Sequence, residues 1–161
     1  MTKVKNNFLN KEDFKNLKDP MLSPNFPWYY NNTKVDKEGK DNLNNYQLTH
    51  TFFIDNKINS GAYHLIEPVL QKLKVKEVIR VKANLVPRTN TTHKFESHLD
   101  QEENCKAAIL YINTNNGYTI FKDKKVASKE NRIALFKANE KHQGTTCTNE
   151  KIRVLINFNY R

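Results

Sequence analysis

The segment AAILYINTNNGYTIFKDKKVASKENRIALF, residues 107–136, decides the fold class. Short apolar runs alternate in it with polar, turn-forming stretches, and the runs have the length and the aromatic and β-branched content of strands. The strand-like runs are 107–112, 118–121 and 132–136, and the turn-like stretches include 113–117 and 128–131. Short strands joined by short turns predict an antiparallel, all-β core.

The sequence on both sides extends this pattern. Further strands are expected at 47–54, from 75 to about 85, at 94–97 and at 152–158. Helices are expected earlier in the chain, from residue 11 to about 19 and over 63–73. Asn10 is a candidate N-cap for the first helix, and Asp19-Pro20 is the expected stop. Helices followed by many strands favour a β-sandwich or barrel braced by N-terminal helices.

Composition limits the classes of protein to consider. The 161 residues, 37% of them apolar, fit one domain with a hydrophobic core. The formal net charge of +10 suits nucleic acid, an acidic protein or an anionic small molecule as partner, or simply a lysine-rich surface. No apolar run is long enough for a membrane span, and residues 1–9 lack the apolar core of a signal peptide. Cys105 and Cys147 form no CxxC pair and suit a reducing compartment, so a cytoplasmic location is expected.

One pattern points to metal chemistry: His98-Leu99-Asp100, followed far downstream by His142. Side chains two residues apart on a strand project to the same side. A third ligand from a distant strand completes one face of an octahedron and leaves the opposite face open, as in the facial triad of non-haem iron(II) oxygenases. An H-x-D pattern alone is weak evidence, and zinc accepts the same ligands.

From about residue 78 to residue 160, the sequence resembles the 2-oxoglutarate/Fe(II)-dependent oxygenase superfamily, especially its prolyl 4-hydroxylase-type branch and small phage-encoded members. The matching segments stand in the family's order: His98-Leu99-Asp100, Leu110-Tyr111-Ile112-Asn113, Gly117-Tyr118-Thr119-Ile120-Phe121, Asn131-Arg132-Ile133-Ala134-Leu135-Phe136, His142-Gln143-Gly144 and Arg153-Val154-Leu155-Ile156-Asn157-Phe158. The resemblance implies a mainly β fold, the double-stranded β-helix or jelly-roll. Residues 75–161 would form its catalytic core, and residues 1–74 a helical support and loop, within one domain spanning 1–161.

The resemblance also implies roles for single residues. It makes His98, Asp100 and His142 the Fe(II) ligands. It assigns the distal carboxylate of 2-oxoglutarate to a basic residue on the last strand, for which Arg153 is preferred because its planar fork binds a carboxylate bidentately. Lys151 is the alternative, expected on the same strand face. Supporting contacts to 2-oxoglutarate are expected from Tyr111, Asn157 and Asn84. Ascorbate is a further expected cofactor.

The implied activity is hydroxylation of a peptide or protein with dioxygen and 2-oxoglutarate, with prolyl residues as the leading target. Leu85 and Phe95 weaken the prolyl assignment, because relatives that act on proline often carry tyrosines in this stretch. The alternatives are a nucleobase or small-molecule oxygenase, a non-catalytic cupin-like module and a zinc enzyme. Arg153 and Tyr111 argue against zinc, since a zinc hydrolase needs no carboxylate clamp there. The compartment is the host cytoplasm if the chain is phage-encoded.

Several other features keep two interpretations. The aromatic residues 28–30 either face a substrate or pack in the core. Arg80 and Arg88 share one face of the long strand and meet either an anionic substrate or solvent. Residues 31–45 are either a lid over the site or a disordered loop. No metal-binding role is expected for the remaining histidines, at positions 50, 64 and 93.

Overall fold

Antiparallel strands are the main regular structure of the computed structural model, which describes residues 1–32, 45–100 and 105–161. The N-terminal part contains β1 (Lys3–Lys5), α1 (Lys11–Met21), β2 (Tyr29–Asn31), β3 (Gln47–Ile54), β4 (Lys57–Ile58), the 3-10 turn η1 (Tyr63–Ile66) and α2 (Glu67–Leu73). The remainder contains β5 (Val78–Pro87), β6 (Lys106–Tyr111), β7 (Tyr118–Phe121), β8 (Lys125–Ala127), β9 (Arg132–Lys137), β10 (His142–Gly144) and β11 (Ile152–Tyr160). The predicted mainly β class is confirmed.

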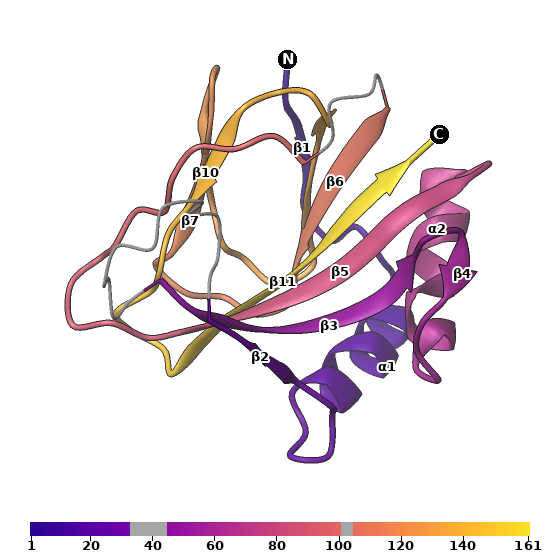
Figure 1. Ribbon diagram of the computed structural model, residues 1–161, viewed down its shortest axis with the longest axis horizontal. Coiled ribbons are helices and arrows are strands. Elements are labelled where there is room, and N and C mark those ends of the chain that lie inside the picture. Colours follow the sequence, from indigo (N-terminus) through magenta and orange to yellow (C-terminus); the bar gives the residue numbers. More distant parts are fainter. Residues whose placement is uncertain (33–44, 101–104) are drawn as a thin grey trace.

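Two antiparallel sheets build the β core. The larger has the order β1-β9-β6-β11-β5-β3-β2, with β4 paired to β3, and the smaller has the order β10-β7-β8. Neighbours in the larger sheet are distant in sequence, as expected of a jelly-roll: β11 lies between β5 and β6. In Figure 1 the helices lie on one side of the larger sheet, and β7 and β10 lie on the other.

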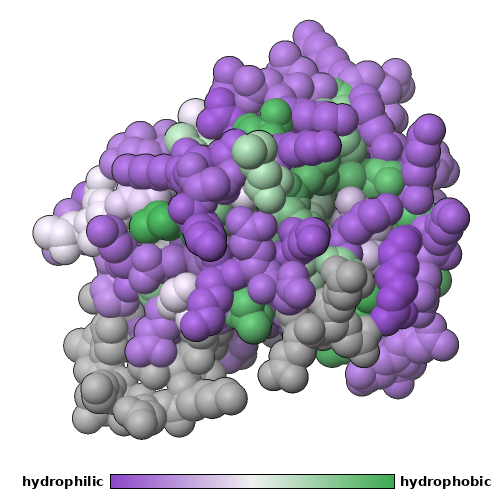
Figure 2. All heavy atoms as spheres, turned by 90° about the horizontal axis from the view of Figure 1, so that it is seen from above, coloured by the Kyte–Doolittle hydropathy of each residue, from purple (hydrophilic) through white to green (hydrophobic). Residues whose placement is uncertain are grey.

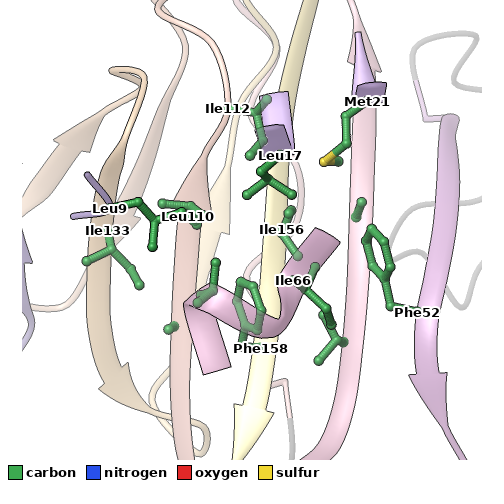
Figure 3. Packing of buried hydrophobic residues seen from close by; sticks show 14 of the residues in the cluster. Leu9, Leu17, Met21, Phe52, Ile66, Leu110, Ile112, Ile133, Ile156 and Phe158 are labelled. Atoms are coloured by element: carbon green, nitrogen blue, oxygen red, sulfur yellow. The ribbon is translucent and has the colours of Figure 1, made fainter. Parts of the chain in front are cut away.

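The main apolar core lies between the larger sheet and the helices. Strand β11 contributes Val154, Ile156 and Phe158, which alternate along the strand and are all fully buried. The helices contribute Leu17, Met21, Ile66 and Val69 to the same cluster, and Figure 3 shows several of these side chains meeting those of the strands. A second, smaller cluster lies on the other face of the sheet and includes Phe121, Phe136 and Leu155.

Helix α1 begins as predicted. The side chain of Asn10 accepts a hydrogen bond from the backbone N–H of Asp13 at 2.8 Å, which caps the first turn. The helix extends two residues beyond Asp19, because it includes Pro20 and ends at Met21, so the expected stop at Asp19-Pro20 is slightly too early. Met21 is completely buried in the core, and this packing stabilises the last residues of the helix despite the proline.

The predicted strands at 47–54 and 118–121 coincide with β3 and β7. The strand predicted at 94–97 is wrong, because this stretch makes only an isolated bridge between Lys94 and Thr145. The helix predicted over 63–73 is divided, with a 3-10 turn before α2 and Pro68 in the first turn of α2. In the part of the chain that the structure describes, no helix has both the length and the apolar character needed to cross a bilayer.

Candidate metal centre and its cavity

Three side chains from two segments converge: His98 and Asp100 follow β5 in one segment, and His142 is the first residue of β10. One ligand atom from each lies within 4.8 Å of those of the other two. Nε2 of His142 is 3.6 Å from Oδ1 of Asp100, and Nε2 of His98 is 3.9 Å from the same oxygen. His98 and His142 were 44 positions apart in the sequence, and an isolated antiparallel bridge joins their backbones by two hydrogen bonds of 3.0 Å. The sequence predicts that His98 and Asp100 lie on the end of a strand. In the structure they lie outside the named strands, and His98 makes only this single bridge.

Neighbouring groups hold both imidazoles in a metal-binding orientation. Nδ1 of His98 lies 3.3 Å from the carbonyl of Glu96, and Nδ1 of His142 lies 3.2 Å from the carbonyl of Glu140. Because Nδ1 of each ring faces a carbonyl, Nε2 is the ring nitrogen that lies on the side of Asp100 and can bind a metal. The ring of His142 also packs against Phe136, with ring centroids 5.0 Å apart.

The carboxylate of Asp100 is buried and anchored at its other oxygen. Its side chain is 2% exposed, and Asn159 donates a hydrogen bond from Nδ2 to Oδ2 at 3.2 Å. The guanidinium of Arg80 lies 3.8 Å from Oδ1. Two imidazoles and one carboxylate, turned towards one point and fixed by outer contacts, are a donor set that fits a divalent first-row metal such as Fe(II).

A cavity of about 160 Å³ adjoins this centre. Alternate residues of β5 and β11 line its wall: Arg80, Lys82, Asn84, Val86, Arg153, Leu155 and Asn157. The metal-ligand candidates His98, Asp100 and His142 also line it. The structure therefore brings the predicted metal ligands and three of the predicted 2-oxoglutarate contacts, those from Arg153, Asn157 and Asn84, to one cavity.

Arg153 is a buried cation at one end of this cavity. Its residue is 1% exposed, and its guanidinium donates hydrogen bonds to Ser128 Oγ at 2.8 Å, Thr119 Oγ1 at 3.0 Å and the carbonyl of Thr145 at 3.3 Å. Burial lowers the pKa of Arg153, yet an arginine side chain stays protonated in proteins. No carboxylate among the described residues lies within 4.0 Å of it. A buried, charged fork without an anion favours an anionic ligand.

Tyr111 lies behind this cation and does not line the cavity. Its hydroxyl donates a hydrogen bond to Thr119 Oγ1 at 2.9 Å, and this same oxygen accepts from Arg153. Burial is the main cause that raises the pKa of Tyr111, so the phenol is neutral. In the structure Tyr111 therefore reaches Arg153 through Thr119, and the expected contact of Tyr111 with 2-oxoglutarate stays a prediction.

Sequence reasoning missed the groups that position Arg153: Thr119, Ser128 and Thr145. Gly117 belongs with them, because a Cβ built there would lie 2.6 Å from Cδ of Arg153. The sequence pattern predicts only a turn at Gly117. The small size of this residue was the available signal, since a glycine beside a buried strand often marks a close approach of another chain segment.

Lys151 and Arg153 are separated by the structure. Strand β11 begins at Ile152, so Lys151 precedes it and is exposed, whereas Arg153 is buried. Lys151 is not among the residues that line the cavity. The prediction that Lys151 and Arg153 lie on the same face of the strand is therefore wrong, because Lys151 precedes the strand. Only Arg153 is positioned to contact a ligand in the cavity.

The two arginines of the long strand also differ. Arg80 lines the cavity, while Arg88 follows the end of β5 at Pro87 and is exposed. Lys82 lies on the cavity side of β5, and burial is the main cause that lowers its pKa. The two buried polar atoms Arg80 Nε and Asn157 Oδ1 have no hydrogen-bond partner in the described part of the chain.

The remaining features of the sequence lie away from the centre. Trp28 packs against Phe26 with ring centroids 5.1 Å apart, while Tyr29 and Tyr30 are exposed. His50 is buried, with Nδ1 2.8 Å from the carbonyl of Pro27 and Nε2 2.7 Å from Ser60 Oγ. His64 is exposed, and His93 packs edge-on against Phe95. Most of the expected lid lies outside the described residues, because 33–44 are not described.

Comparison with known proteins identifies the fold. No family model matches the chain, and a search of curated protein sequences found no match. Solved structures match over 99% of the chain. They include a prolyl hydroxylase from Trichoplax adhaerens, solved in complex with a hypoxia inducible factor peptide (TM-score 0.71, 13% identity, 82% of that chain covered).

Two bacterial structures are similarly close: a 2OG-Fe(II) oxygenase family oxidoreductase from Burkholderia pseudomallei (TM-score 0.70, 9% identity, 84% covered) and a Pseudomonas putida prolyl-4-hydroxylase (TM-score 0.62, 14% identity, 92% covered). In each case the match spans 99% of the present chain. The low identities mean that the likeness lies in the backbone and not in the sequence. The chain therefore has the jelly-roll fold of the 2-oxoglutarate/Fe(II) oxygenases, prolyl hydroxylases among them.

Proposed function

We propose that this protein is an Fe(II)- and 2-oxoglutarate-dependent dioxygenase that hydroxylates a peptide or protein. The observation that carries the proposal is the buried guanidinium of Arg153, which has no carboxylate partner in the described chain and shares one cavity with His98, Asp100 and His142. A metal site alone fits many functions. A metal site with a buried cation in the same cavity fits a co-substrate with an anionic end.

Different residues of the cavity have different roles in such a reaction. His98, Asp100 and His142 hold the metal, and Arg153 binds and orients the distal carboxylate of 2-oxoglutarate. Thr119 and Ser128 fix the guanidinium, so little ordering is needed when the dicarboxylate binds. The bound iron, with dioxygen and 2-oxoglutarate, supplies the oxidation that hydroxylates a C–H bond and releases succinate and carbon dioxide.

A prolyl residue is the leading substrate. Three of the similar solved structures are described as prolyl hydroxylases, from Trichoplax adhaerens, from Pseudomonas putida and from a Chlorella virus, and the first was solved with a peptide bound. The nucleobase and small-molecule alternatives share the same metal chemistry. A zinc enzyme or a cupin-like binding module does not need a buried cation that binds a carboxylate, so neither alternative explains the burial of Arg153.

Succinate formation tests the proposal. The full-length protein should form succinate only when Fe(II) and 2-oxoglutarate are both added, and a candidate peptide should gain one oxygen by mass spectrometry. His98→Ala should reduce succinate formation by more than about 100-fold, because loss of an outer partner of a ligand already costs roughly 10- to 100-fold. His93→Ala is the matched control, since His93 is outside the group of metal-ligand candidates. Metal-independent turnover, or equal loss in both variants, would reject the proposal.

A further inference from the structure

Strand β5 places two cations on the cavity wall beyond those needed for 2-oxoglutarate. Arg80 and Lys82 are two residues apart, so they project to the same side, and both line the cavity. Nε of Arg80 is buried without a hydrogen-bond partner in the described chain. The nearest described carboxylate to Arg80 is that of Asp100, at the long distance of 3.8 Å, and Lys82 makes no ion pair within 4.0 Å among the same residues.

These two cations lie at the end of the strand pair away from Arg153. In the β5–β11 register Arg153 is opposite Val86, whereas Lys82 is opposite Asn157 and Arg80 is opposite Asn159. Arg153 and Asn159 are six positions apart on β11, which is about 20 Å along a strand. Arg80 is therefore next to the metal-ligand candidate Asp100, and a carboxylate held by Arg153 does not neutralise it.

The formal charges of the cavity leave an excess. The described residues that line it carry three cations, Arg80, Lys82 and Arg153, and one carboxylate, Asp100. A divalent metal and a dicarboxylate co-substrate cancel each other's charge, so the loaded cavity keeps the same formal excess of two positive charges. Glu102 and Glu103 follow in the sequence but lie outside the described residues. Positive charge in a partly dehydrated cavity is stabilised by an anionic ligand.

We propose that the substrate is an acidic peptide, whose aspartate or glutamate side chain binds Arg80 and Lys82 beside the residue to be hydroxylated. This inference rests on the proposed function and specifies its substrate. The cations line the interior of a small cavity next to the metal ligands, which suits a single side-chain carboxylate. Arg88, by contrast, is exposed and lies outside this cavity.

Two other features fit a peptide recognised by polar contacts. Oε1 of Gln47, a cavity residue on β3 that is 3% exposed, is buried without a partner in the described chain and offers an acceptor for a peptide N–H. On the molecular face seen in Figure 2, hydrophilic side chains predominate and apolar ones are confined to smaller patches between them. Charge complementarity sets specificity and the association rate, and a largely hydrophilic face suits a partner recognised in this way.

Peptide binding to the loaded protein tests the inference without turnover. The full chain is supplied with Mn(II) and 2-oxoglutarate, and fluorescence anisotropy measures the Kd of three labelled peptides. All three have a central proline, flanked by glutamates in the first, glutamines in the second and lysines in the third. We expect the glutamate peptide to bind at least about tenfold more tightly than the glutamine peptide, and the lysine peptide most weakly.

The variants locate the effect. Lys82→Gln should remove most of the preference for the glutamate peptide over the glutamine peptide, and Arg80→Gln should do the same. Arg80 also contacts Asp100, so the Mn(II) affinity of its variant is measured as well. Arg88→Gln removes the same charge from an exposed position outside the cavity and should keep the preference. Arg80→Lys keeps the positive charge and should retain part of the preference for the glutamate peptide.

Three results would overturn the inference: equal wild-type affinity for the glutamate and glutamine peptides, an equal effect of Arg88→Gln, or no binding of any acidic peptide. Tighter binding of a single-stranded oligonucleotide, lost in Lys82→Gln, would replace the peptide by nucleic acid. Succinate release by the same wild-type protein, reloaded with Fe(II) in place of Mn(II) and measured without peptide, reports the proposed oxygenase itself. Its absence counts against the proposed function, whereas a missing glutamate preference with succinate present counts against this inference alone.

Discussion

The two faces of strand β11 differ sharply although their residues alternate along one chain segment. On one face Val154, Ile156 and Phe158 are fully buried against the helices. On the other face Arg153 and Asn157 line the cavity. The apolar face is satisfied by the chain itself, because its side chains pack against other parts of the same core.

The cavity face is left incomplete. Buried polar atoms normally have hydrogen-bond partners, and here Asn157 Oδ1, Asn159 Oδ1 and Arg80 Nε have none in the described chain. Such groups reduce the stability of the free protein and are retained where a ligand completes them. Changes on one face of the sheet should therefore alter folding, and changes on the other should alter binding.

The largest effect on the apolar face is expected for Phe158→Ala. Removal of this fully buried ring leaves a cavity between β11 and the helices and should lower the free energy of unfolding by about 3–5 kcal/mol. Asn157→Ala, the adjacent position on the other face, should change it by less than about 1 kcal/mol. Urea denaturation followed by circular dichroism measures both. Similar losses in the two variants would contradict the distinction between the faces.

On the cavity face, Arg153→Gln should weaken binding of 2-oxoglutarate to the metal-loaded protein by about 10- to 100-fold, because charge-assisted hydrogen bonds contribute roughly 1.5–3 kcal/mol. Lys151→Gln should change the affinity by less than about twofold, since Lys151 is exposed outside the cavity. Isothermal titration calorimetry gives both constants. A larger effect at Lys151 would move the carboxylate clamp to that residue.

Gly117→Ala should have a smaller effect of the same kind. The added Cβ would lie 2.6 Å from Cδ of Arg153, so the arginine must shift, and we expect about a three- to tenfold loss of 2-oxoglutarate affinity. Gly61→Ala is the matched control, because a Cβ there meets no atom within 4 Å. If both alanine variants bound 2-oxoglutarate like the wild type, Gly117 would not be needed to position the guanidinium.

The smallest effect concerns pH and lies outside the cavity. Burial lowers the pKa of His50, so the folded protein prefers the neutral imidazole while the unfolded chain takes up a proton near pH 6.5. Stability linked to His50 is therefore complete above about pH 6.5 and decreases as the pH falls below it. The metal-free melting temperature of His50→Gln should fall less between pH 7.5 and 5.5 than that of the wild type. Parallel curves would show that His50 does not contribute.

Local patterns predicted the fold well where a segment carries its own signal. Asn10 caps α1 as its residue type indicated, and the alternation at 47–54 gave the bounds of β3. Short polar strands such as β1 could not be predicted, because β1 exists by pairing with β9, about 130 positions later. Their partners are set by the tertiary structure and not by their own residues.

The site residues were predicted mainly from the resemblance to the 2-oxoglutarate/Fe(II) oxygenases, and less from the spacing of the histidines and the aspartate in the sequence. The distance between His98 and His142 follows from one antiparallel bridge that no local pattern encodes. The hydrogen-bonding groups around Arg153 come from three separate segments, and Thr119, Ser128 and Thr145 are ordinary residues for strands and turns. Their importance becomes visible only when the buried guanidinium is placed between them.

Anaerobic calorimetry with Fe(II) followed by 2-oxoglutarate tests the central claim most directly. We predict that the wild-type chain binds one Fe(II), that 2-oxoglutarate binds with high affinity only after the metal, and that Asp100→Ala loses both steps while it remains folded. Iron binding that is unchanged in Asp100→Ala, or 2-oxoglutarate that fails to bind the iron-loaded wild-type protein, would contradict the account.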